Sequence, residues 1–150
     1  MTTTNIPPLA LTMGDPAGIG PDITLALWAA RDALSLPPFL FIGDARVLRE
    51  RAAVLGLDIA VAAVEPETAS AVFPKAIPVL AADCPAPVVP GAPDARNAGA
   101  IIGAIETAVA LTMAGQTSAV VTNPIAKAVL YDAGFGFPGH TEFLADLAAK

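Results

Sequence analysis

The chain has 150 residues and a formal net charge of -6, with 8 Lys or Arg against 14 Asp or Glu. Its 55% hydrophobic content excludes a disordered protein, and its length fits one domain with a sizeable core. The acidic balance argues against a nucleic-acid phosphate backbone and against an anionic membrane as partners, whereas a small anionic substrate requires only a locally positive site.

The cysteine content and the start of the chain indicate a reducing compartment. The single Cys84 excludes an intramolecular disulfide and has no second thiol or His at metal-ligand spacing. The start, MTTTNIPPLAL, lacks the basic and apolar segments of a secretory signal. Residues 107–126 are uncharged, but turn-forming residues interrupt them, which favours helix, turn and strand over a membrane span. We therefore predict a cytoplasmic protein without membrane contact.

The first apolar run, residues 9–13, predicts a strand, and the glycine loop GDPAGIGP follows it. Its G-x-x-x-G-x-G spacing matches neither the dinucleotide fingerprint nor the P-loop, and no Lys follows. Asp15 adds a negative charge, which favours a loop that closes over a substrate or contacts a metal or a hydroxyl group. The alternative is that the glycines only turn the chain tightly.

The next segments alternate between helix and strand. A helix beginning at Pro21 is predicted to bury one face and to end before Pro37 and Pro38; that face comprises Ile23, Leu27, Ala30 and Leu34. Residues 39–42 predict a second strand, and Asp44 is a candidate cap for a helix over residues 45–55. On that helix we expect Val47, Leu48 and Val54 to face inward and Arg46, Arg49 and Arg51 to form a solvated face.

The middle of the chain is less regular. Residues 59–64 predict a third strand, but seven prolines fall between Glu65 and Pro93 and exclude long regular structure there. Within this window residues 77–80 are expected to form a strand at a sheet edge or an irregular connection. Asp94 or Asn97 is then expected to cap the longest helix, which runs to about Ala114.

The stretch from Val120 to Leu147 carries most polar residues without an obvious structural role. Residues 120–122 predict a strand buried on both faces, and residues 125–133 a short helix. The following FGFPGHTEF segment places three phenylalanines around glycines and a proline, which is typical of a rigid loop. A last helix, residues 141–150, has no stop signal, so we expect the chain to be part of something longer.

Two residues of that loop are the favoured site residues. His140 is the only His and titrates near neutrality, and Thr141 lies beside it at a helix start, where backbone N–H groups suit an anion. Lys127 is a further candidate, weighed evenly against a solvated Lys. Glu142 and Asp132 require no catalytic explanation.

Three blocks resemble the 4-hydroxythreonine-4-phosphate dehydrogenases, the PdxA-type enzymes of pyridoxal phosphate (vitamin B6) biosynthesis. The blocks are MGDPAGIGPDI, VVTNPIAKAVLYDAG and FPGHTEF. The resemblance implies a three-layer α/β/α fold with a largely parallel sheet, similar to isocitrate and isopropylmalate dehydrogenases, with residues 1–150 as a single α/β domain that forms the N-terminal portion and with the C-terminal half absent. It also implies substrate-binding roles for His140 and Thr141, and leaves the catalytic residues unknown.

The implied reaction is the oxidation and decarboxylation of 4-phosphohydroxy-L-threonine to 3-amino-2-oxopropyl phosphate with NAD or NADP. The resemblance further implies a homodimer and a divalent metal (Zn, Mg or Co) whose ligands are expected after Lys150. One alternative is a dehydrogenase of another phosphorylated hydroxy acid, such as threonate or erythronate 4-phosphate. Another is a catalytically silent fragment, and we expect this polypeptide alone to be inactive.

Overall fold

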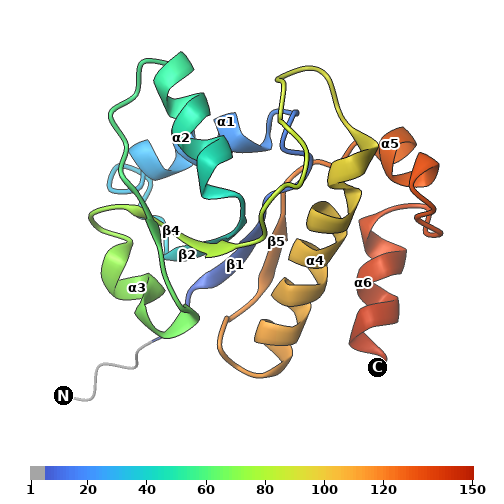
Figure 1. Ribbon diagram of the computed structural model, residues 1–150. Helices are drawn as coiled ribbons and strands as arrows, with labels where there is room; N and C mark the ends of the chain where they lie inside the picture. Colours follow the sequence, from blue (N-terminus) through green and yellow to red (C-terminus); the bar gives the residue numbers. More distant parts are fainter. Residues whose placement is uncertain (1–5) are drawn as a thin grey trace.

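The computed structural model describes residues 6–150, which form one parallel sheet with helices on both faces (Figure 1). The elements are β1 (Leu9–Thr12), α1 (Gly20–Ala29), β2 (Phe39–Gly43), α2 (Ala45–Val54), β3 (Val61–Ala63), the 3₁₀ turn η1 (Pro66–Thr68), α3 (Ala69–Val72), β4 (Ile77–Ala81), the 3₁₀ turn η2 (Ala95–Asn97), α4 (Ala98–Met113), β5 (Val120–Thr122), α5 (Lys127–Asp132) and α6 (His140–Ala148). Among these helices, none is long and apolar enough to cross a membrane.

The sheet has the strand order β3-β4-β2-β1-β5, and every neighbouring pair is parallel. The central strand β2 has the sequence FLFIG and is buried at all five positions, as expected for a continuous apolar run covered on both faces. The predicted layered α/β architecture with a largely parallel sheet is therefore confirmed.

The two faces of the sheet are covered by different helices. Alternate strand residues such as Leu11 and Phe41 pack against α1 and α2, while their neighbours Ala10 and Leu40 pack against α4. The small side chains Ala104 and Ala108 let α4 approach the sheet closely. Outside α4, a third apolar cluster holds α5 and α6, so α4 lies between the sheet and α6 (Figure 1).

Two strand predictions were wrong in their position. β4 lies inside the sheet and not at an edge, because its β2 pairing begins at Val79, one residue after Pro78, so the proline's missing N–H precedes that ladder. β5 is an edge strand in the described chain and is not buried on both faces, since Val121 is 44% exposed. Val121 lines an apolar cavity of about 190 Å³ on the face of the sheet that α1 covers, together with Leu9 and Leu27.

The predicted inner face of the first helix was partly wrong, although Leu27 and Ala30 are half-buried. Ile23 and Leu34 are exposed, and the helix ends at Ala29, well before the prolines. Trp28 and Leu25 are buried instead. The indole Nε1 of Trp28 donates to a backbone carbonyl oxygen at 2.9 Å, and this tertiary hydrogen bond fixes the rotation of the helix about its axis.

The second helix begins as predicted, but two of its side chains are buried or exposed contrary to the prediction. Asp44 caps it by accepting from the backbone N–H of Arg46 at 2.9 Å. Val54 is 78% exposed and Arg51 is 7% exposed, so the predictions for both residues were wrong. Arg51 lies four residues after Val47 and three after Leu48, so helical spacing already placed it on the buried stripe.

Candidate functional site

The carboxyl ends of the parallel strands meet at one edge of the sheet, where open α/β sheets bind their ligands. The glycine loop, here residues 14–20, follows β1 at this edge, and Asn123 follows β5. Asp44 follows β2. These three polar segments therefore lie at one edge of the sheet.

The histidine loop, here residues 134–141, is held by the aromatic residues that flank it. The rings of Phe135, Phe137 and Phe143 pack together with centroid separations of 5.0 to 5.5 Å. The hydroxyl of Tyr131 donates to the carbonyl oxygen of Pro138 at 2.9 Å. The predicted aromatic anchors of the loop are confirmed, and its rigidity stays a prediction.

His140 begins α6 and is partly buried. Its Nε2 atom is buried without a hydrogen-bond partner among the described residues. Gly139 precedes it in an extended conformation and offers no side-chain cap, so the first N–H groups of α6 lack a side-chain acceptor within the described chain. An orphaned imidazole nitrogen beside an uncapped helix start is an arrangement that an anionic or hydroxyl-bearing ligand can satisfy.

Lys127 lies against the same helix start. Its Nζ atom is 3.5 Å from the position that a β-carbon on Gly139 would take, and Glu142 Oε2 is 3.6 Å from that position. Burial lowers the pKa of His140, and the nearby positive charge of Lys127 lowers it further. The structure therefore brings Lys127, His140 and Glu142 together, while Thr141 lies exposed in the first turn of α6.

The glycine loop is packed tightly against the turn after β5. Gly14 has φ +68°, and a β-carbon there would lie 2.4 Å from the carbonyl oxygen of Pro124. A β-carbon on Gly20 would lie 3.0 Å from that of Asn123. The amide of Asn123 donates to the Thr24 hydroxyl at 3.1 Å and is itself buried. These two glycines are required by close packing of the protein on itself.

Asp15 lies within this packed loop and is 3% exposed. Its Oδ1 atom accepts from the Ala17 N–H at 2.8 Å. Burial raises the pKa of Asp15, and the Ala17 hydrogen bond opposes that rise. The loop does not fit a dinucleotide pyrophosphate, because the Asp15 carboxylate would repel it and Asn123 fills the space beside the glycines. That the loop closes over a substrate or contacts a metal or a hydroxyl group stays a prediction.

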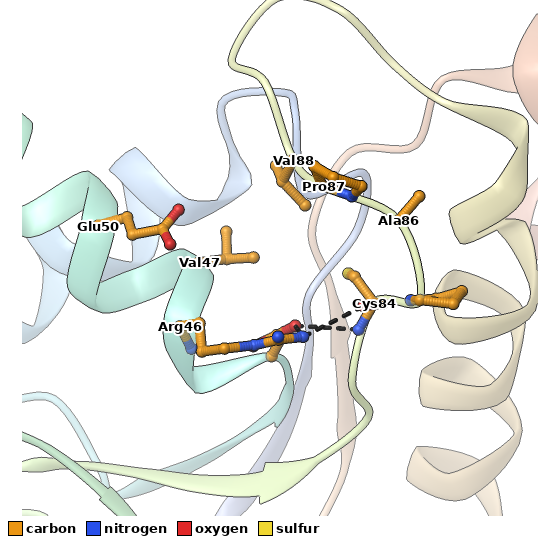
Figure 2. Close-up of a pocket in the computed structure, with 9 residues that line it drawn as sticks. Arg46, Val47, Glu50, Cys84, Ala86, Pro87 and Val88 are labelled. Atoms are coloured by element: carbon orange, nitrogen blue, oxygen red, sulfur yellow. Dashed lines mark hydrogen bonds and ion pairs between the residues drawn. The ribbon is translucent and has the colours of Figure 1, made fainter.

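A separate cavity of about 320 Å³ lies between α2 and residues 84–88 (Figure 2). Figure 2 shows Arg46 extending toward Cys84 at its base. Burial would raise the pKa of Asp44, but hydrogen bonds from Arg46 and from the Cys84 N–H outweigh it and lower that pKa. Burial raises the pKa of the Cys84 thiol to about 12, so the thiol is protonated and unreactive at neutral pH. Neither His140 nor Thr141 lines this cavity.

Asp44 and Asn97 are structural anchors that sequence reasoning treated only as caps. Asp44 Oδ2 accepts from the Cys84 N–H at 2.9 Å, and Asn97 Oδ1 accepts from the Ala86 N–H at 2.9 Å. The cap of η2 is Asp94. The two contacts join residues 40 and 11 positions apart, which lie outside the one-turn range of a capping pattern.

The residues present do not fit a metal centre. Across residues 6–150, no three His, Cys, Asp or Glu side chains are grouped so that they could hold a metal ion.

Comparison with known proteins identifies the family. The family model described as pyridoxal phosphate biosynthetic protein PdxA matches residues 35–150. A 4-hydroxythreonine-4-phosphate dehydrogenase of Methylorubrum extorquens is 57% identical over 145 residues, covering 95% of this chain and 42% of that protein.

Solved structures agree with this match. The crystal structure of 4-hydroxythreonine-4-phosphate dehydrogenase from Klebsiella pneumoniae has a TM-score of 0.82 and 37% identity, covering 94% of this chain and 44% of that one. A terephthalate 1,2-cis-dihydrodiol dehydrogenase from Burkholderia xenovorans LB400 has a TM-score of 0.65 and 28% identity, covering 90% and 39%. The chain spans less than half the length of these relatives, and it belongs to the PdxA family of pyridoxal phosphate biosynthetic proteins.

Proposed function

We propose that this chain is the N-terminal part of an NAD- or NADP-dependent 4-hydroxythreonine-4-phosphate dehydrogenase and that His140 and Thr141 bind its substrate. The single observation that carries the site is the buried, unpartnered Nε2 atom of His140 at the start of α6. Relatives that bear this enzyme name match 95% of the chain, including the histidine loop.

The charges around α6 favour the phosphate or the carboxylate of 4-phosphohydroxy-L-threonine. The N-terminal N–H groups of a helix and its dipole attract an anion, and the Lys127 ammonium adds a full positive charge beside them. Glu142 opposes that field, and its position suits an amino group. Thr141 is exposed and can donate or accept through its hydroxyl.

The protonation state of His140 gives it a defined role. Because its pKa is lowered, the imidazole is neutral at neutral pH and can both donate and accept a hydrogen bond. It can therefore orient the hydroxyl group of the substrate and take part in moving its proton. The nicotinamide cofactor accepts the hydride in such a reaction, and we assign no residue of this segment to the cofactor or to the metal.

A second candidate keeps the fold and changes the substrate to another phosphorylated hydroxy acid, such as threonate or erythronate 4-phosphate. The likeness to a dehydrogenase that acts on a dihydrodiol favours it, because the same architecture then serves a different hydroxyl compound. The proposal also includes a cytoplasmic homodimer and, for this polypeptide alone, an absence of turnover.

The test begins with intact mass and NAD reduction on the same sample, using 4-phosphohydroxy-L-threonine, threonate 4-phosphate and erythronate 4-phosphate with a divalent metal. Calorimetric titration of each compound then compares Lys127→Met with Lys75→Met, which removes the same charge from an exposed residue outside the site. We expect Lys127→Met and His140→Asn to weaken binding about tenfold or more, equal to about 1.4 kcal/mol. Unchanged affinity in both variants would refute the assignment of this site.

A further inference from the structure

Arg51 is a buried cation on α2, and its bonds reach the glycine loop. Its guanidinium Nη1 donates to the carbonyl oxygen of Gly18 at 3.1 Å, and Nη2 donates to that of Pro16 at 3.3 Å. Nη1 also forms an ion pair with the carboxylate of Asp22 at the start of α1. The side chain is only 8% exposed, so solvent screens these contacts little.

The glycine loop is thus held from two sides, and the N–H of Gly91 also donates to the carbonyl oxygen of Ala17 at 2.8 Å. On one side, the N–H of Asp15 donates to the carbonyl oxygen of Pro124 at 2.9 Å, which ties the loop to the turn after β5. On the other side lies Arg51, which donates hydrogen bonds to the carbonyl oxygen atoms of Pro16 and Gly18. The buried carboxyl of Asp15 lies between these two attachments, bonded to an N–H of the same loop.

The planar guanidinium suits this task better than an ammonium group does. It reaches three acceptors from two nitrogen atoms in fixed directions, whereas a lysine supplies one charge on a flexible stem. Asp22 is 35% exposed on its side chain, so the ion pair alone contributes modestly to stability. The hydrogen bonds from Arg51 to the two carbonyl oxygen atoms therefore fix the position of the loop more than the ion pair does.

We propose that Arg51 is a positioning residue, which fixes the glycine loop so that Asp15 stays at the carboxyl end of β1, beside the substrate edge. The inference rests on the proposed function for the identity of that edge. Arg51 does not touch the substrate in this account. It acts through the backbone of residues 16–18.

The matched control is Arg31 on the segment after α1. Its guanidinium also donates to two backbone carbonyl oxygens, those of Trp28 and Pro74, each at 2.9 Å, and it packs 3.6 Å from the centroid of the Trp28 ring. Arg31→Met therefore removes the same group and the same number of carbonyl bonds as Arg51→Met. It leaves the glycine loop untouched.

The first measurement is amide hydrogen exchange on the chain itself. In Arg51→Met we expect the amides of Ala17 and Gly18 to exchange about tenfold faster or more, while the amides inside α2 keep their wild-type protection. Arg51→Lys should keep part of the wild-type protection of these amides. Asp22→Asn should keep most of it, because Arg51 still donates to the carbonyl oxygen atoms of Pro16 and Gly18. Arg31→Met should leave both loop amides as in wild type. If Arg51→Met does not fold, Arg51→Lys and Asp22→Asn decide by the same comparison.

The second measurement is steady-state kinetics on a protein that joins this chain to its C-terminal part and that turns over substrate. Loop misplacement is expected to lower kcat/KM about tenfold in Arg51→Met at a temperature where the variant is fully folded, with partial rescue in Arg51→Lys and no change in Arg31→Met. Loop exchange and kinetics that match wild type in Arg51→Met would overturn the inference. If a protein that joins this chain to its C-terminal part does not turn over the phosphorylated hydroxy acids either, the proposed function fails, and hydrogen exchange alone decides the role of Arg51.

Discussion

The glycine loop lies at the carboxyl edge of the sheet and the histidine loop lies beyond α4, and the two loops satisfy their polar groups in opposite ways. In the glycine loop, the carboxyl of Asp15 and the carbonyls of Pro16 and Gly18 all have partners inside the protein. In the histidine loop, the Nε2 atom of His140 has none within the described residues.

The two loops therefore differ in what their polar atoms indicate about ligand binding. A segment rich in glycine is usually examined first for a ligand, yet here the glycines permit the chain to pack against Asn123 and Pro124. The histidine loop is fixed by aromatic packing, and the Nε2 atom of His140 is buried there without a partner among the described residues. Unsatisfied polar atoms on a rigid base are the better indication of a binding site.

The largest expected effect comes from Gly14→Ala, compared with Gly56→Ala. Both glycines have φ +68°, but a β-carbon meets Pro124 at 2.4 Å in the first case and nothing within 4 Å in the second. We expect Gly56→Ala to cost about 1 kcal/mol from backbone strain and Gly14→Ala about 3 kcal/mol or more in urea unfolding. Equal costs for the two variants would contradict the close packing of the glycine loop.

A smaller effect separates Asn123→Ala from His140→Ala. Asn123 is buried and donates to Thr24, so its loss leaves a polar group without its partner and a gap beside two glycines. We expect a cost of about 2 kcal/mol. His140→Ala removes an already unpartnered nitrogen, and the relief of that burial cost offsets lost packing, so we expect about 0.5 kcal/mol or less. Thermal unfolding at pH 7.5 measures both, and a larger cost for His140→Ala would reverse the comparison.

The smallest effect is electrostatic. The folded-state pKa of His140 lies below its ordinary value of 6.5, so below about pH 6.5 the unfolded chain binds the proton more tightly and His140 contributes a loss of stability as the pH falls. Lys127→Met should raise the pKa of His140 and lessen that loss, and Lys75→Met should change neither. NMR titration of the single imidazole reports the pKa directly. A pKa that does not move in Lys127→Met would mean that burial alone lowers it.

Local sequence determined the order and type of most elements. The continuous apolar run at residues 39–42 specified a buried strand, and Asp44 specified the start of the next helix, because each signal depends on covalent neighbours alone. The aromatic anchors and the helix start after Gly139 were likewise predictable. The family was predictable from the three sequence blocks, because residue identities can be compared without knowing which residues are in contact.

Only the tertiary structure decided which faces are buried and which polar residues meet. The hydrogen bond from Trp28 to Phe73 rotates α1 and exposes Ile23. Helical spacing already places Arg51 on the buried stripe of α2, but only the tertiary structure supplies the carbonyl groups of the glycine loop as its partners. The positions of β4 inside the sheet and of Lys127 beside Gly139 have the same origin. Each depends on contacts between residues distant in sequence, and the free energy of such contacts outweighs local preference when a parallel sheet brings them together.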